Sequence, residues 1–242
     1  MPEVAASPRV EHAKRLFAGL PGSYDRMGAL LSFGQDPRWR RFMVSRLPAD
    51  PSARLLDVAT GTGMVAREAV RRTGASVVAL DLTEEMLRGG VSETAAEGLD
   101  GRVRFLLGDG RRLPFADGSF DGLTFTYLMR YVDDVETTLA ELARVVKGGG
   151  ILANLEFHVP ANPALKALWL LYTRAVIPAF GRVVSRSWYE VGRFLGPSIS
   201  SFYERWPLER QLSAWRAAGV GDVRARVMSA GGGMVIWGTK DG

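Results

Sequence analysis

The sequence predicts an α/β fold, a mostly parallel sheet with helices on both faces, closed by an antiparallel hairpin. Short apolar strands alternate with amphipathic helices between Arg54 and Phe157, which is typical of right-handed βαβ crossovers. A glycine turn in LLDVATGTG, residues 55–63, follows the first strand, where open α/β sheets bind nucleotide-like ligands. Only residues 229–232 separate the last two strand patterns, and so short a link fits a reversal rather than a parallel crossover.

Seven strands follow from this pattern. In chain order they are expected at residues 54–58, 76–80, 103–107, 121–126, 151–157, 222–228 and 233–237. Helices are expected after the first, second and fourth strands, and another over residues 207–218 precedes the hairpin. We interpret residues 1–242 as a single domain. It comprises an N-terminal cap (1–50), a cofactor-binding core (51–158), an acceptor lid (159–206) and a closing helix with the hairpin (207–242).

The composition excludes several classes of protein. The 242 residues are 47% hydrophobic and 24% charged, as in ordinary globular proteins. The net charge of +5 is scattered, so no nucleic-acid partner is expected. The protein has no cysteine, which excludes disulfides and thiolate zinc sites, and no metal site is expected. The N-terminus lacks the apolar core of a signal peptide, and Lys166 and Arg174 interrupt the longest apolar run. We therefore expect a cytoplasmic protein, with peripheral contact at a membrane left open.

Asp57 distinguishes this glycine turn from a dinucleotide site. The acid stands near the end of the first strand, ahead of Gly61 and Gly63 in DVATGTG. A pyrophosphate at such a turn would be repelled by an adjacent carboxylate. A carboxylate instead suits a cationic ligand, such as S-adenosylmethionine with its amino group and sulfonium. We expect Asp57, Gly61 and Gly63 to hold the methionine end of that cofactor, and Thr62 to add a hydroxyl.

Three more strand ends supply candidate cofactor contacts. Asp81 ends the second strand, and its carboxylate can accept hydrogen bonds from both ribose hydroxyls. Asp109 and Gly110 end the third strand and are expected at the adenine edge. Thr126 ends the fourth strand and is expected near the transferred methyl. An acid after a glycine turn is also typical of NAD sites, so an NAD-dependent oxidoreductase remains an alternative, against which Asp57 and the antiparallel ending argue.

At this point the chain resembles the ubiquinone/menaquinone biosynthesis C-methyltransferase family over nearly its whole length. The matching segments are SYDRM (23–27), SFG (32–34), Trp39-Arg40, DVATGTG (57–63), LPFADGSFD (113–121), Arg130, LARVVKGGG (142–150), LEF (155–157), Ile177-Pro178, Ser198-Ile199 and GGMVIWGTK (232–240). The resemblance implies a class I methyltransferase sheet of order 3-2-1-4-5-7-6 with the last strand antiparallel. It also implies methyl transfer from S-adenosylmethionine to a ring carbon of a polyprenyl quinol, demethylmenaquinol or a relative of it.

The resemblance also assigns roles. Thr62, Asp81, Asp109, Gly110 and Thr126 match cofactor contacts, and Tyr24 and Arg130 match acceptor-site residues. Because a quinol carbon becomes nucleophilic when a neighbouring hydroxyl is ionised, Arg130 is expected to stabilise the phenolate. Arginine cannot itself take the proton. The alternative for Arg130 is a salt bridge to Asp133 or Asp134.

The proton acceptor is left open among water and side chains. His158, just past the fifth strand, titrates near neutral pH and is the obvious candidate, although a lone histidine is more often a packing residue. Tyr24 is expected to stack on the acceptor ring or bind its oxygen, or else only to anchor the N-terminal segment.

Four positions depart from the family pattern. Gly28 replaces the usual Asn, Asp36-Pro37 replaces His-Arg, Tyr131 replaces Asn after the arginine, and Gly110-Arg111 replaces Ala-Glu. Most of these changes lie on the acceptor side. Two further hypotheses therefore stay open: a methyltransferase acting on another lipophilic or aromatic molecule, and a catalytically silent cofactor-binding partner.

The lid carries more apolar surface than a small polar acceptor requires. Its apolar residues include Leu168, Trp169, Leu170, Leu171, Tyr172, Val176, Ile177 and Phe180. Such a surface suits a lipid tail or a membrane. The same residues also suit packing of the lid onto the sheet, or a homodimer interface.

Overall fold

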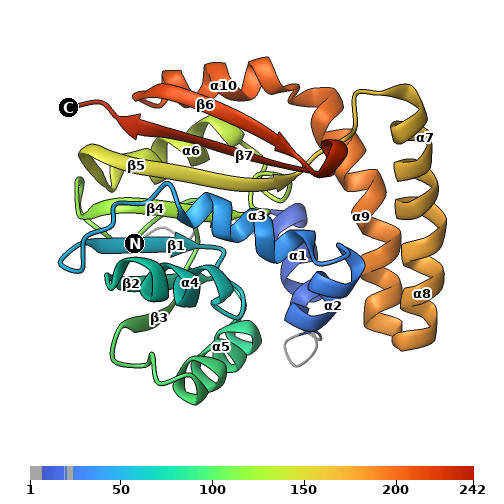
Figure 1. The fold of residues 1–242 in the computed structure, drawn as a ribbon, viewed down its shortest axis with the longest axis horizontal. Coiled ribbons are helices and arrows are strands. Elements are labelled where there is room, and N and C mark those ends of the chain that lie inside the picture. The colour runs from blue at the N-terminus through green and yellow to red at the C-terminus, as the bar shows by residue number, and fades with distance from the viewer. Residues whose placement is uncertain (1–6, 19, 21–23) are drawn as a thin grey trace.

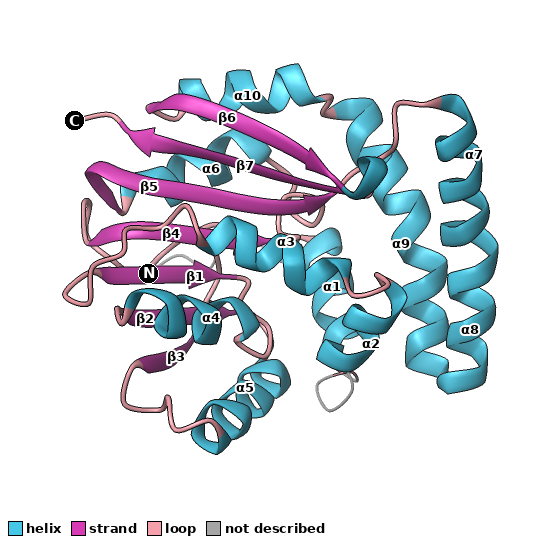
Figure 2. Cartoon of the chain, in the orientation of Figure 1, coloured by secondary structure: helices cyan, strands magenta, loops and turns pink. Residues whose placement is uncertain are grey.

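The computed structural model describes residues 7–18, 20 and 24–242, and a seven-stranded sheet forms its centre (Figures 1 and 2). The strand order is β3-β2-β1-β4-β5-β7-β6, so the predicted fold class and order are confirmed. The strands are β1 (Arg54–Val58), β2 (Ser76–Asp81), β3 (Val103–Leu107), β4 (Phe120–Thr126), β5 (Val146–Phe157), β6 (Val220–Met228) and β7 (Gly233–Lys240).

The first five strands run parallel, and β7 is antiparallel to both β5 and β6. The predicted strand bounds are close except at β5, which begins at Val146 rather than at residue 151. The glycine run at 148–150 does not separate helix from strand as expected. It lies within β5, where a register shift between Phe120 and Gly122 on β4 accommodates it.

Helices cover both faces of the sheet. On one face, α3 (Gln35–Val44) packs against β5 and β7, and α4 (Met64–Thr73) packs against β1 and β2. Together they bury Met43, Val65 and Val70. On the other face, α6 (Val135–Arg144) and α10 (Leu208–Ala217) bury Leu139 and Trp215. Helix α5 (Glu84–Ala96) lies beside β3 at the edge. Because both faces are covered, the central strands are apolar on both sides.

The remaining helices gather at the carboxyl ends of the parallel strands (Figure 1). They are α1 (Pro8–Ala18), α2 (Tyr24–Leu31), α7 (Pro163–Leu171), the π-helical turn η1 (Tyr172–Val176), α8 (Ile177–Val184) and α9 (Arg186–Arg205). Leu16 on α1 packs against Trp188 and Val191 on α9. The N-terminal helices and the lid therefore meet over this edge, next to the strand ends that the sequence predicts to bind the cofactor.

Helices α7, η1 and α8 form one continuous helix. The π turn precedes Pro178, which has no N–H to donate to the preceding turn. Among the described residues, this 22-residue segment, Pro163–Val184, is long and apolar enough by length and composition to cross a membrane. The expectation that Lys166 and Arg174 prevent such a run is therefore wrong. Only 22% of the apolar stretch is buried, so most of it faces outward.

Candidate active site

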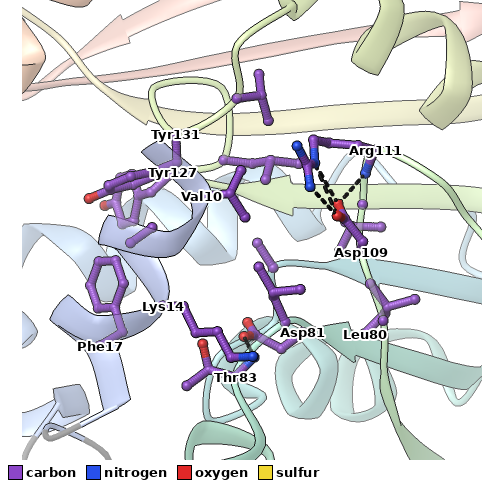
Figure 3. A pocket seen from close by; sticks show the side chains of 18 of the residues that line it. Val10, Lys14, Phe17, Leu80, Asp81, Thr83, Asp109, Arg111, Tyr127 and Tyr131 are labelled. Carbon is purple, nitrogen blue, oxygen red and sulfur yellow. Dashed lines mark hydrogen bonds and ion pairs between the residues drawn. The ribbon is translucent and has the colours of Figure 1, made fainter. Parts of the chain in front are cut away.

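A cavity of about 130 Å³ lies at the carboxyl ends of β1, β2 and β4 (Figure 3). The predicted cofactor residues that line it are Asp81, Asp109, Gly110 and Thr126. Its outer wall comes from Val10, Ala13, Lys14 and Phe17 of α1, and Lys14 extends toward Asp81 and Thr83 in Figure 3. This volume is below the roughly 300–1,000 Å³ of typical small-molecule pockets, and α1 narrows the cavity on its outer side. No sequence pattern indicates that this helix covers the cavity.

Asp81 connects β2 to the glycine turn. Its Oδ2 accepts a hydrogen bond from the Gly61 backbone N–H at 2.7 Å, and its Oδ1 accepts one from the Thr83 N–H at 2.9 Å. Burial raises the pKa of Asp81, while the N–H groups of Gly61 and Thr83 oppose that rise. A carboxylate has about four acceptor positions, so Asp81 retains capacity for the hydroxyls of a ribose.

Asp57 lies beneath the cavity rather than in its wall. The side chain is 1% exposed, and its two oxygens accept hydrogen bonds from Thr60 Oγ1 at 2.5 Å and Thr124 Oγ1 at 2.7 Å. Burial raises the pKa of Asp57 to about 6, against the opposing effect of these two hydroxyls. The predicted direct contact between Asp57 and the methyl donor stays a prediction, since in this structure Asp57 anchors the turn from below.

The glycine turn has the backbone that its sequence predicts. Gly61 and Gly63 have φ of +58° and +82°, a region that favours glycine. Ala59 also has a positive φ, +55°, and it lines the cavity, although the sequence does not single it out. Thr62 points away to the cap, where its Oγ1 donates to Asp25 Oδ1 at 2.5 Å. The turn is thereby tied to α2.

The other two strand ends bring polar atoms to the cavity. Asp109 is held by Arg111, whose Nη2 lies 2.7 Å from Asp109 Oδ2 (Figure 3). The Oγ1 of Thr126 is buried and has no hydrogen-bond partner among the residues that the structure describes. An added Cβ on Gly110 would lie 2.7 Å from Val58 Cγ1, so the backbone here comes close to the cavity floor. The unpaired hydroxyl of Thr126, the Asp81 carboxylate that can bind ribose hydroxyls, and the backbone of Gly110 at the cavity floor together suit S-adenosylmethionine.

A second cavity, of about 460 Å³, lies between the cap, the carboxyl edge of the sheet and the lid. Its wall is mostly apolar, with Leu16, Trp169, Ile177 and Phe194 among the residues that line it. Three of the positions that depart from the family pattern, Gly28, Asp36 and Tyr131, also line it. Phe17, Tyr127 and Tyr131 border both cavities. The two cavities therefore meet at these aromatic rings.

Arg130 brings a buried positive charge to the second cavity. Its Nε lies 2.8 Å from Glu156 Oε1, and each side chain of this ion pair is 1% exposed. Arg130 Nη1 also donates to Ser198 Oγ at 3.0 Å. The ion partner is thus Glu156 rather than Asp133 or Asp134, the alternatives taken from sequence proximity. Glu156 was not a candidate, although it stands in the LEF segment at 155–157.

Tyr127 and Asp36 form a second polar contact at the junction of the cavities. The Tyr127 hydroxyl donates to Asp36 Oδ1 at 2.5 Å, and Arg40 Nε donates to Asp36 Oδ2 at 2.7 Å. The Tyr127 ring stacks on Phe157 with centroids 4.2 Å apart. Neither Tyr127 nor the carboxylate of Asp36 was a candidate from the sequence, because their partners are remote along the chain.

The remaining candidates lie elsewhere. His158 follows β5 but is not among the residues that line either cavity. Its Nδ1 lies 3.1 Å from the Gly231 carbonyl, its ring meets Tyr203 edge-on, and burial lowers its pKa. Tyr24 begins α2, and its side chain lies outside the described residues. The catalytic roles of His158 and Tyr24 stay predictions.

Solved structures with this fold include several methyltransferases. A protein in the complex between the Haloferax volcanii Trm112 methyltransferase activator and a methyltransferase matches with TM-score 0.65 at 20% identity, covering 93% of this chain and 98% of that one. A SAM-dependent methyltransferase from Aquifex aeolicus matches with TM-score 0.55 at 18% identity, covering 82% and 88%. At these identities the likeness concerns the fold alone.

Sequence relatives are closer. A protein of Geobacter sp. (strain M21) named ubiquinone/menaquinone biosynthesis C-methyltransferase UbiE is 36% identical over 238 residues, 98% of this chain and 99% of its own length. The demethylmenaquinone methyltransferase of Thermus thermophilus is 37% identical over 217 residues, 89% of this chain and 96% of its own. The profile of the ubiE/COQ5 methyltransferase family matches residues 5–240. The chain therefore belongs to the ubiE/COQ5 methyltransferase family and is an S-adenosylmethionine-dependent methyltransferase.

Proposed function

We propose that this protein methylates a ring carbon of a polyprenyl quinol, demethylmenaquinol or a close relative of it. The observation that carries the proposal is the apolar cavity of about 460 Å³ beside the cofactor cavity, with Arg130 in its wall. Quinone-pathway names of relatives at 34–39% identity support the same acceptor class. An apolar cavity with one fixed cation suits a lipophilic ring that must carry a negative charge.

The residues of the cavity meet the needs of this chemistry. When bound, S-adenosylmethionine supplies an electrophilic methyl group, so the protein has to orient the nucleophile and exclude water. Arg130 is fixed by Glu156 and Ser198, and its remaining donors can bind the developing phenolate. Phe17, Tyr127 and Tyr131 border both cavities and can hold the ring against the donor.

A panel of acceptors tests this proposal. Purified protein is incubated with methyl-labelled cofactor and with demethylated naphthoquinols and benzoquinols of short and long tails, kept reduced. We expect label in a product whose mass rises by one methyl and whose new carbon–carbon bond is located by fragmentation. Methylation confined to oxygen or nitrogen of another aromatic compound would refute the quinol assignment and favour the alternative acceptor class.

We also propose that the outer face of α7 and α8 contacts an anionic bilayer. Val183, Leu168 and Leu171 on this face are 86%, 63% and 59% exposed. Between Phe157 and Glu190 the sequence has four cations, Lys166, Arg174, Arg182 and Arg186, and no acidic residue. An exposed apolar face flanked by cations is typical of helices that lie in an anionic membrane surface.

The acceptor cavity supports this orientation. Leu165 and Leu168 of the same helix and the 75%-exposed Phe33 line the cavity. A polyprenyl tail can therefore remain in the bilayer while the ring enters the cavity. The protein would then be cytoplasmic and peripheral at the membrane, and the apolar face would serve lipid rather than a homodimer.

Vesicle flotation tests the bilayer contact. Leu171→Glu with Val183→Glu should reduce binding to phosphatidylglycerol-containing vesicles by more than about ten-fold, because charge replaces buried apolar area. Val91→Glu is the matched control, since Val91 is 52% exposed on α5 and should bind like wild type. Light scattering is run in parallel. The proposal would be overturned if the wild-type protein is a dimer that does not bind vesicles and the double variant is a monomer.

A further inference from the structure

We infer that Asp36, acting through the Tyr127 hydroxyl, takes the proton from the ring hydroxyl of the acceptor. The inference rests on the proposed function only in requiring an acceptor with an aromatic hydroxyl. It assigns the proton acceptor, which Arg130 cannot be because a guanidinium does not give up its proton in proteins.

Tyr127 lies where the two cavities meet. Tyr127 directly follows Thr126 at the end of β4 and lines both cavities. The Tyr127 ring therefore borders both cavities, and the partner of its hydroxyl, Asp36, lines the acceptor cavity. That hydroxyl donates to Asp36 Oδ1 at 2.5 Å, a short contact of the kind formed between O–H groups and carboxylates.

The backbone of Tyr127 is held in an unfavourable conformation. Its φ is +57°, a left-handed value that an aromatic residue rarely adopts and that costs on the order of 1–3 kcal/mol. Its N–H donates to the Leu155 carbonyl at 2.9 Å, and its ring lies parallel to Phe157 with an interplanar angle of 5°. Such fixed strain clusters at functional sites, and here it aims the hydroxyl at Asp36.

Asp36 is the carboxylate suited to this task. Two acids line the acceptor cavity among the described residues, Asp25 and Asp36. Asp25 is engaged away from the junction, by Thr62 Oγ1 at 2.5 Å and by Arg67 Nη2 at 3.3 Å. Asp36 is 4% exposed and is oriented by Arg40 Nε at 2.7 Å. Its other oxygen, Oδ1, accepts from the Tyr127 hydroxyl, so a proton can pass from the ring hydroxyl through Tyr127 to Asp36.

Glu156 does not compete for this role. It pairs with Arg130 and is absent from the residues that line either cavity. His158 is likewise absent from both linings and uses Nδ1 on the Gly231 carbonyl. Tyr131 also lines both cavities. Among the described residues, however, no carboxylate is hydrogen-bonded to the Tyr131 hydroxyl, as Asp36 is to Tyr127, to accept its proton.

The proton balance closes over one turnover. As the ring carbon uses its electron pair to form the new carbon–carbon bond, the bond from methyl carbon to sulfur breaks and its pair remains on sulfur. The ring O–H proton passes to Tyr127 Oη, and the Tyr127 proton passes to Asp36 Oδ1. The methylated ring then loses its C–H proton to water, while Asp36 returns a proton through Tyr127 to the ring oxygen. One proton is released, and both side chains are restored.

Three variants test the inference: Asp36→Asn, Tyr127→Phe and the double variant. General-base contributions are typically about 10²–10⁴-fold, so each single variant should lower kcat by at least about 100-fold. KM and the affinity for S-adenosylhomocysteine, measured by calorimetry, should change less than about three-fold. Since the two residues act as one unit, the double variant should be little worse than either single one. Tyr189→Phe on α9, outside both linings, is the matched control.

Chemical rescue separates proton transfer from structural support. Asp36→Ala should regain activity with added formate, at least ten-fold over equal chloride, whereas a purely structural loss would not respond to a small carboxylate. Unchanged kcat in Asp36→Asn, or loss of kcat accompanied by equal loss of cofactor affinity and no formate rescue, overturns the inference. Turnover is measured with whichever phenolic acceptor wild type methylates. Failure of polyprenyl quinols would thus refute the proposed function alone.

Discussion

Arg130 and Glu156 form an ion pair in which Nε lies 2.8 Å from Oε1 and both side chains are 1% exposed. Burial raises the pKa of Glu156, and Arg130 opposes that rise. The second oxygen of Glu156, Oε2, has no hydrogen-bond partner among the described residues. A buried pair of this kind fixes a charge in place more than it stabilises the fold. Its position beside the acceptor cavity indicates that it serves the reaction.

Removing Arg130 alone should therefore damage both stability and turnover. Arg130→Ala leaves the Glu156 carboxylate buried and unpaired, which costs about 3–5 kcal/mol. Joint replacement, Arg130→Met with Glu156→Leu, removes both charges and should recover most of this loss in urea unfolding. Methyl transfer should stay low in both variants, because neither has a cation at the phenolate.

The double variant supplies the control for misfolding. If the double variant had both the stability and the turnover of wild type, Arg130 would act only as the ion partner of Glu156. Affinity for S-adenosylhomocysteine should remain within about three-fold of wild type, since Arg130 does not line the cofactor cavity.

Asp57 should make stability depend on pH. Its pKa in the folded protein is about 6, above the ordinary value of 3.8, so the folded state binds this proton more tightly than the unfolded state. The contribution is fully present below about pH 3.8 and is lost as pH rises through about 6. It amounts to about 3 kcal/mol. Asp57→Asn has no such titration, so it should gain stability relative to wild type between pH 4 and 7. Urea midpoints across this range measure the difference, and parallel curves would contradict it.

Most of the fold could be predicted from the sequence because its signals are local. Strands β1, β2 and β3 are short apolar runs. β1 ends one residue after Asp57, β2 ends at Asp81 and β3 ends just before Gly108. The link at 229–232 admits only a reversal. The predicted start of β5 is wrong because a run of three glycines usually ends regular structure. Pairing with β4 across a register shift keeps that run in the strand, and tertiary pairing of this kind has no local pattern.

The candidate site was predictable only in part. Strand-end residues such as Asp81 and Thr126 reach the cavity because parallel strands place their carboxyl ends at one edge. Pairs such as Arg130 with Glu156, or Tyr127 with Asp36, join residues that are remote in the sequence. Proximity in the sequence wrongly suggested Asp133 or Asp134 as the ion partner of Arg130. Asp57 lies below the cavity because the hydroxyls of Thr60 and Thr124 donate hydrogen bonds to its two oxygens.

Gly110 should be sensitive to a single methyl group. An alanine Cβ at this position would lie 2.7 Å from Val58 Cγ1, and Val58 and Gly110 both line the cofactor cavity. Gly110→Ala should therefore shift the cavity floor and weaken S-adenosylhomocysteine binding about ten-fold, a change of about 1.4 kcal/mol. Gly101→Ala is the matched control, because no atom lies within 4 Å of its Cβ. Equal affinities of the two variants would show that the cavity floor does not contact the cofactor.

Asp81 should contribute most to cofactor affinity. Asp81→Ala removes an acceptor for the ribose hydroxyls and also releases the Gly61 and Thr83 N–H groups, now held at 2.7 and 2.9 Å. Hydrogen bonds to a charged group contribute about 1.5–3 kcal/mol each, so calorimetry with S-adenosylhomocysteine should show a loss of about 100-fold. Asp81→Asn keeps one acceptor oxygen and should lose less. Glu84→Ala is the control, since Glu84 pairs with Arg88 at the surface and should bind like wild type. Binding by Asp81→Ala within two-fold of wild type would exclude the ribose role, because no other acid of β2 reaches the cavity.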